Sequence, residues 1–102
     1  MINVSLLAPS SITTSVTSYN LTDDFTKYQM LFINLKYQGI YLNSVIVPSS
    51  LFSSLTSSSA CVQLQSGETT IQVYKHTNTS VYMAASAATQ NLRIEIIGFL
   101  AY

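Results

Sequence analysis

YQMLFINLKY, residues 28–37, is the stretch that decides the fold of this chain. Leu31, Ile33 and Leu35 occupy alternate positions within it, and the positions between them are apolar as well in its first half. A period of two is the repeat of a β-strand, whose successive side chains point to opposite faces. Because both faces are apolar at the start, we expect this strand to be covered on both sides. A neighbouring subunit is one candidate for the second cover.

Shorter runs of the same kind recur along the chain, separated by turn residues such as those at 38–39 and 66–67. Pro9 is expected to close the first run and Pro48 the one that follows residues 38–39, because proline cannot donate to a strand ladder. The further strands expected are residues 2–7, 12–17, 41–47, 61–65, 70–75, 81–85 and 92–99. The pattern predicts one all-β domain over residues 1–102, a small antiparallel β-sandwich or jelly-roll-like barrel of about eight strands.

Charged residues are scarce in this chain. They make up 8% of the 102 residues, with a net charge of +0, whereas about 25% is usual for a globular domain. The four cations are scattered: Lys27, Lys36, Lys75 and Arg93. Nucleic acid is therefore excluded as a partner, because binding to phosphates needs clustered cations. No run of about 20 apolar residues occurs either, so the sequence predicts no insertion into a membrane.

Residues suited to catalysis are equally few. His76 is the only histidine and Cys61 the only cysteine, so the sequence predicts no metal site, which would need three or four such ligands. No Gly-x-Ser-x-Gly motif and no glycine-rich phosphate loop occurs. We therefore expect neither a cofactor nor enzyme activity, and a hydrolase that uses His76 as its base is the catalytic alternative.

Tyrosines near turns are the best candidates for ligand binding. Tyrosine combines a rigid apolar ring with a polar tip, which suits both sugar stacking and protein interfaces. Tyr37 and Tyr41 flank the turn at 38–39, and Tyr74, Lys75 and His76 end a strand beside a polar loop. These five residues are the candidate ligand-binding residues. The alternative is that the tyrosines are ordinary half-buried strand residues.

A second group of apolar residues is a candidate oligomer interface. Tyr28, Met30 and Phe32 lie on the second face of the strand at 28–37, and the chain ends in the uncharged sequence IGFLAY, which contains Phe99 and Tyr102. Extended apolar surface of this kind is typical of contacts between copies of one chain. We expect these five residues to lie between subunits.

Three apolar segments are expected to form strands and occur in this order along the chain: LFINL at 31–35, GIYLNSVIVP at 39–48 and LRIEIIGF at 92–99. The middle segment continues into a Ser-x-x-Phe motif that ends at Phe52. In this order the segments resemble the C-terminal head domains of bacteriophage tail-fibre and receptor-binding proteins. The motifs are degenerate β patterns that span about two-thirds of the chain, and no binding residue of that family maps onto a position here.

The resemblance implies a virion protein that forms a homotrimer and attaches to a saccharide or protein of the host surface, in contact with other virion proteins. Two alternatives remain. One is a purely structural tail, baseplate or capsid-decoration protein. The other is a stand-alone carbohydrate-binding module or lectin.

Overall fold

The computed structural model describes residues 2–87 and 91–100, which form eight strands and two short helical turns. The helical turns are η1 (Phe25–Lys27), a 3₁₀ turn, and α1 (Ser49–Phe52). The strands are β1 (Ile2–Ser11), β2 (Thr17–Asn20), β3 (Met30–Tyr37), β4 (Ile40–Pro48), β5 (Val62–Ser66), β6 (Thr69–Thr77), β7 (Ser80–Ala85) and β8 (Leu92–Leu100). Among the described residues, no helix has the length and apolarity that crossing a membrane requires.

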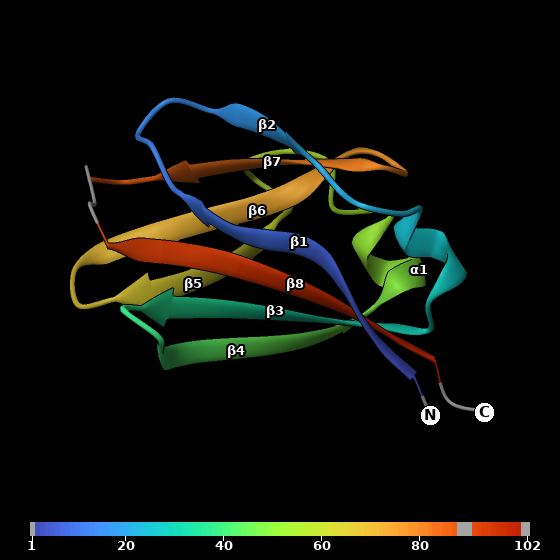
Figure 1. Cartoon of the computed structure of the whole chain (residues 1–102). Coiled ribbons are helices and arrows are strands. Elements are labelled where there is room, and N and C mark those ends of the chain that lie inside the picture. The colour runs from blue at the N-terminus through green and yellow to red at the C-terminus, as the bar shows by residue number, and fades with distance from the viewer. Residues whose placement is uncertain (1, 88–90, 101–102) are drawn as a thin grey trace.

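The strands form two four-stranded antiparallel sheets that lie one in front of the other (Figure 1). The first sheet has the order β1-β8-β3-β4, and the second has the order β2-β7-β6-β5. The chain therefore changes sheet after β1, β2, β4 and β7, while β3–β4 and β5–β6–β7 are hairpin-connected neighbours. The prediction of a small antiparallel β-sandwich with about eight strands is confirmed.

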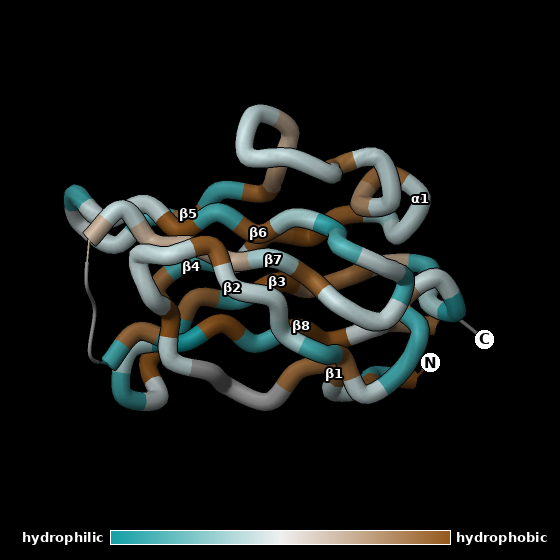
Figure 2. Tube along the Cα trace, turned by 90° about the horizontal axis from the view of Figure 1, so that it is seen from above, coloured by the Kyte–Doolittle hydropathy of each residue, from teal (hydrophilic) through white to brown (hydrophobic). Residues whose placement is uncertain are grey.

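The core lies between the two sheets and follows from the two-residue period. Leu31, Ile33 and Leu35 of β3 are all buried on the inner side of the first sheet. Val73 of β6 and Met83 of β7 are buried in the same core cluster from the second sheet. Brown, hydrophobic positions alternate with paler ones along several strands in Figure 2. This alternation leaves one side of each sheet to face outward.

Two aromatic rings contribute to the same core from the helical turns. Phe25 of η1 and Phe52 of α1 are both fully buried and meet edge to face, with ring centroids 5.2 Å apart. Asp24 caps η1, because its carboxylate accepts a hydrogen bond from the backbone N–H of Thr26 at 2.8 Å. The two turns therefore add core cover that the strands alone would lack.

The β3–β4 hairpin closes in a tight turn with a local irregularity behind it. Gln38 and Gly39 have φ angles of 49° and 86°, and positive φ at both central residues is typical of a type I′ turn, whose twist matches that of the flanking strands. Behind the turn the partners of β3 jump from Tyr41 to Asn43, so one extra residue of β4 forms a bulge.

Two sequence-based expectations at the start of the chain are wrong. Pro9 does not end the first strand, since β1 continues to Ser11, but the pairing with β8 shifts register between Leu7 and Ser10. A proline is tolerated in such an irregular part of an edge strand. Residues 12–17 do not form a strand either: the hydroxyls of Thr13 and Thr17 both donate to the carbonyl of Ser15 at 3.0 Å. Such local side-chain bonds favour a turn over a ladder.

Candidate functional site

The five candidate ligand-binding residues lie on two different sheets. Tyr37 ends β3 and Tyr41 lies in β4 of the first sheet, whereas Tyr74, Lys75 and His76 lie in β6 of the second. The three residues of β6 do not lie together either. Successive side chains of a strand point to opposite faces, so Lys75 points away from the side that carries Tyr74 and His76. The structure therefore does not bring the five residues together into one site.

At the first sheet, Tyr41 belongs to a polar cluster around Glu95 of β8. The hydroxyl of Tyr41 and the side-chain amide of Asn34 both donate to Glu95 Oε1 at 3.2 Å. Lys36 Nζ lies 3.7 Å from Glu95 Oε2 and 4.9 Å from the centroid of the Tyr41 ring. The cluster thus holds Tyr41 in place through its polar tip, while its ring and that of Tyr37 stay exposed.

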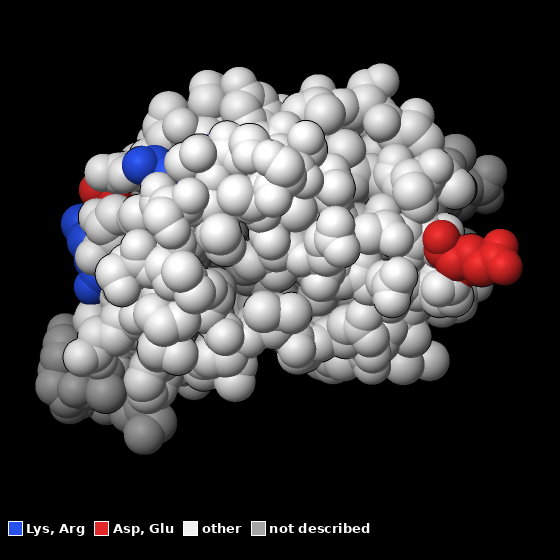
Figure 3. Space-filling model, turned by 180° about the vertical axis from the view of Figure 1, so that it is seen from behind, with Lys and Arg blue, Asp and Glu red and all other residues white. Residues whose placement is uncertain are grey.

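The outward side of the second sheet, which we call the neutral face, is built from aromatic, amide, hydroxyl and methyl side chains. Its centre consists of Gln72, Tyr74 and His76 of β6 and of Tyr82 and Ala84 of β7. Its flanks are Ser18 and Asn20 of β2 and Gln63 and Gln65 of β5. Figure 3 views this side and shows charged residues only toward its margins.

An aromatic row runs along the neutral face. The rings of Tyr74 and Tyr82 have centroids 5.5 Å apart, and those of Tyr82 and His76 are 4.3 Å apart. Tyr74 is buried, Tyr82 half-buried and His76 exposed. In this row Tyr82 and His76 are accessible to solvent, and the buried ring of Tyr74 packs against Tyr82.

The His76 ring is positioned by a hydroxyl. Ser80 Oγ lies 3.1 Å from His76 Nδ1 and 2.6 Å from Thr77 Oγ1. Ser80 is only 5% exposed, so its hydroxyl is closed to a substrate, whereas a nucleophilic serine must reach the reacting carbonyl. Ser80 therefore fixes the orientation of the His76 ring and does not itself reach a ligand on the surface.

A hollow of about 310 Å³ adjoins the aromatic row. Its walls include Thr14 and Val16 from the loop between β1 and β2, and Gln72, Ala84 and Ser86 from the β6–β7 side. Gln72 pairs with Ala84 in the ladder, next on the same side to the pair formed by Tyr74 and Tyr82. The hollow and the row are therefore continuous.

The sequence predicts neither Tyr82 nor Val16 as a binding residue. Alternation does place Tyr82 on the outer side of β7, because its neighbours Val81 and Met83 point into the core.

The outward side of the first sheet carries an apolar cluster, Met30, Phe32, Ile46, Ile97 and Phe99, which we call the apolar face. The rings of Phe32 and Phe99 are stacked, with centroids 5.7 Å apart and an angle of 17° between their planes. Ile46 is 61% exposed beside them. Three of the expected interface residues, Met30, Phe32 and Phe99, thus meet on this face.

The two other expected interface residues are not part of the apolar face as described. Tyr28 is 7% exposed and belongs to the core, where its ring packs against Gly98 and its hydroxyl donates to Asp23 Oδ2 at 3.0 Å. Tyr102 lies outside the described residues. Ile46 and Ile97 were not expected there, although Val45 and Val47 on the inner side of β4 imply an outward Ile46.

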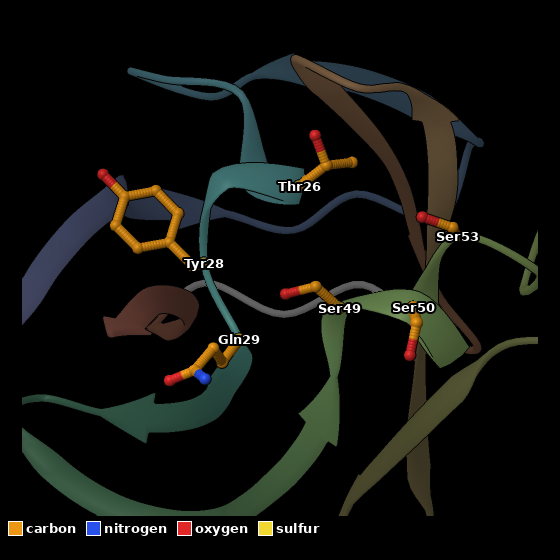
Figure 4. A pocket seen from close by; sticks show the side chains of 6 residues that line it. All are labelled: Thr26, Tyr28, Gln29, Ser49, Ser50 and Ser53. Atoms are coloured by element: carbon orange, nitrogen blue, oxygen red, sulfur yellow. The ribbon is translucent and has the colours of Figure 1, made fainter. Parts of the chain in front are cut away.

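A second hollow, of about 400 Å³, lies beside η1 and α1 (Figure 4). Its lining contains no charged residue: Thr26, Tyr28, Gln29, Ser49, Ser50 and Ser53. The Ser49 hydroxyl is buried and has no hydrogen-bond partner among the residues that the structure describes. It points toward the side of Tyr28 and Gln29 in Figure 4. A water molecule in the hollow would satisfy this hydroxyl, as is usual for buried polar groups.

No family model matches the chain, and neither the curated proteins nor the solved structures contain a significant match to it. Within residues 2–87 and 91–100, no three His, Cys, Asp or Glu side chains are grouped so that they could hold a metal ion.

Proposed function

We propose that this protein is a non-catalytic virion domain that associates with copies of itself through the apolar face and attaches to its target through the neutral face. The apolar face is the observation that carries the proposal, because Ile46 is 61% exposed beside two stacked phenylalanines. Met30, Phe32, Ile97 and Phe99 are half-buried around it, so these five side chains form one apolar cluster on the outward side of the sheet. Monomeric soluble proteins rarely leave such a concentration of apolar surface open.

A second copy of the chain is the occupant that fits this face best. The whole outward side of the first sheet, four strands about 4.8 Å apart and about eight residues long, covers roughly 500 Å². The apolar face is the part of this side away from the Glu95 cluster, so its area lies below the 600 Å² or so per partner of the smaller specific interfaces, and the association it supports is a weak one. The net charge of +0 means that two copies do not repel one another.

Association through the edge of β4 is less favoured than association through the face. The bulge behind Tyr41 interrupts the free edge, and the strand ends at Pro48. Asn43 Oδ1 also accepts a hydrogen bond from the backbone N–H of Gln65 at 2.8 Å, which ties β4 to β5 of the other sheet. Bulges, prolines and covered edges are devices that prevent strand addition.

The resemblance to phage tail-fibre heads gives this assembly its biological context. A β-sandwich that uses one sheet for self-association keeps the other sheet free, and the free sheet here is the neutral face. In a virion head of this type the copies form a homotrimer at the tip of a fibre or baseplate. A tail or decoration protein with a purely structural role would use the same apolar face, so the neutral face distinguishes the two roles.

Sedimentation equilibrium of the wild-type protein and of the Ile46→Glu variant tests the proposal. We expect the wild type to be an oligomer at micromolar concentration, with a trimer as the state that the resemblance implies. Burial of an isoleucine side chain contributes about 1.5–3 kcal/mol, so the variant should associate at least about tenfold more weakly. Because Ile46 is mostly exposed, the variant should still unfold in one cooperative transition, with its midpoint lowered only by the loss of the stabilisation that association gives the wild type.

Leu51→Glu is the matched control, because Leu51 is also exposed but lies in α1, outside the apolar face. It should associate like the wild type. A wild-type protein that stays monomeric throughout, or equal association of all three proteins, contradicts the proposal.

A further inference from the structure

We infer that the hollow at Ala84 and the aromatic row beside it form one binding site for a neutral glycan. The inference rests on the attachment role proposed above and names its ligand class. The hollow, of about 310 Å³, reaches the size range of small-molecule sites. From Gln72 to His76 the site extends four strand residues, or about 14 Å, so it is long enough for more than one sugar ring.

The wall formed by the loop between β1 and β2 is held in place by hydrogen bonds. The backbone carbonyl of Thr13 accepts a bond from the N–H of Ala85 at 2.8 Å, which fixes the loop against β7. The hydroxyls of Thr13 and Thr17 both donate to Ser15 O at 3.0 Å and lie 3.2 Å from each other. The loop thus presents Val16, 56% exposed, at the rim of the hollow in a preformed position. Preorganisation of this kind lowers the entropy lost on binding.

The opposite wall is fixed by a pair of bonds between β6 and the residue after β7. The N–H of Thr70 donates to Ser86 Oγ at 2.8 Å, and the N–H of Ser86 donates to Thr70 O at 2.8 Å. Ser86 Oγ accepts a hydrogen bond in this contact, so its hydroxyl hydrogen can still be donated to a ligand in the hollow. Ala84 forms the floor between the walls, and its single methyl group leaves the space that a larger side chain would fill.

The lining matches the two kinds of surface that a pyranose presents. Its C–H face needs an apolar or aromatic plate, which Val16 supplies within the hollow and the half-buried ring of Tyr82 supplies in the adjoining aromatic row. Its hydroxyls need donors and acceptors, which the side-chain oxygen of Gln72 and the hydroxyls of Thr14 and Ser86 supply. The Gln72 Nε2 amide also donates to the backbone carbonyl of Ser58 at 3.3 Å, which fixes the side chain. A site built in this way is largely apolar with a few placed polar groups, as is usual for small-ligand sites.

The lack of charged side chains in the proposed site favours neutral glycans over anionic ones. No Lys, Arg, Asp or Glu lines the hollow or the aromatic row among the described residues. Sulfated or carboxylated sugars are recognised through arginine or lysine, which can form charge-assisted hydrogen bonds with them. The site would have to desolvate such an anion without compensation. The ligand class is therefore a neutral hexose or N-acetylhexosamine glycan.

An NMR titration of the ¹⁵N-labelled protein tests the inference with four probes: maltotriose, cellotriose, triacetylchitotriose and the anionic sugar N-acetylneuraminic acid. We expect at least one neutral trisaccharide to shift the amide signals of residues around 14–16, 70–72 and 82–86, and N-acetylneuraminic acid to leave them in place. Ala84→Leu fills the hollow and should weaken binding at least tenfold. Val16→Ser removes an exposed side chain that no fold contact needs and should weaken it several-fold.

Leu51→Glu is again the control, since Leu51 is exposed in α1 and does not line the hollow. It should bind like the wild type. The inference is overturned if no neutral trisaccharide binds, if both hollow variants bind like the wild type, or if the anionic sugar alone binds. Ile46→Glu should bind a trisaccharide with the same affinity per chain, so failure of self-association and failure of this site give different results.

Discussion

Asp23 is the residue through which charge contributes most directly to local structure. Its Oδ1 accepts a bond from the backbone N–H of Asp24 at 2.8 Å and lies 3.0 Å from Lys27 Nζ, while its Oδ2 accepts from the Tyr28 hydroxyl at 3.0 Å. The bond to Lys27, followed by those from Asp24 and Tyr28, holds the pKa of Asp23 below its usual value of 3.8. The same contact raises the pKa of Lys27.

A dependence of stability on acid follows from the lowered pKa of Asp23. The unfolded chain binds a proton at this carboxyl more readily than the folded protein does, so its contribution is fully present above pH 3.8 and is lost as the pH falls through the folded-state pKa. Thermal unfolding should therefore show a lower midpoint for Asp23→Asn than for the wild type at neutral pH. The two midpoints should converge in strong acid, and an unchanged difference there would contradict this account.

The sequence predicts which single residues are exposed near turns, but it does not predict which side chains they contact in the fold. Tyr41 and His76 were singled out because they lie next to turns, and both rings are indeed open to solvent. The partner of the Tyr41 hydroxyl, Glu95, is 54 positions away in the chain. The sequence does not indicate that Tyr82 belongs to the aromatic row, because its ring contacts with Tyr74 and His76 form across the β6–β7 ladder.

At the scale of elements, β8 is shaped by one close approach. A side-chain carbon at Gly98 would lie 2.6 to 2.9 Å from three ring carbons of Tyr28, which is nearer than real carbon atoms come. The ring of Tyr28 is buried and its hydroxyl is bonded to Asp23, so it has little freedom to move away. Gly98 is therefore needed for the turn before β3 to pack on the end of β8.

Gly98→Ala should destabilise the protein by about 1–3 kcal/mol, which is the usual cost of overpacking a core. Urea unfolding measures the change. Gly98→Ala should cost less in a Tyr28→Leu background than in the wild type, because the smaller side chain makes room for the added methyl group. A neutral effect of Gly98→Ala alone would show that Tyr28 does not pack as described.

Strands whose apolar residues alternate were predicted closely, and strands rich in hydroxyls were not. The expected strand at 81–85 is β7, which runs Ser80–Ala85. Residues 12–17 carry the same alternation in a weaker form, yet their threonine hydroxyls bond to a local carbonyl and the strand begins only at Thr17. Propensity cannot separate these two outcomes, because a local bond competes with a ladder that depends on distant residues.

For the molecule as a whole, the scarcity of charge has a definite spatial pattern. Lys36, Arg93 and Glu95 lie at one end of the first sheet's outer side, and Asp23, Asp24 and Lys27 lie in and beside η1. The aromatic row and the hollow carry none of the eight charges. The molecule therefore has one outward side suited to apolar association and another suited to neutral polar ligands.

The assignment of these two sides could not be predicted from the sequence. Two apolar faces on the strand at 28–37 correctly indicated that β3 presents apolar side chains outward. The pairing of β3 with β8 and β4, which gathers Phe32, Ile46 and Phe99 in one place, joins segments far apart in the chain. Short-range patterns do not encode such pairings, which is why Ile46 was not expected at the interface.

Hydroxyl-radical footprinting at increasing protein concentration tests the central claim, self-association through the apolar face, most directly. We predict that oxidation of Met30, Phe32 and Phe99 falls as the concentration rises into the micromolar range, while oxidation of Tyr82 and His76 stays constant. Constant oxidation of the apolar face at all concentrations, or protection of Tyr82 and His76 in its place, would contradict the account.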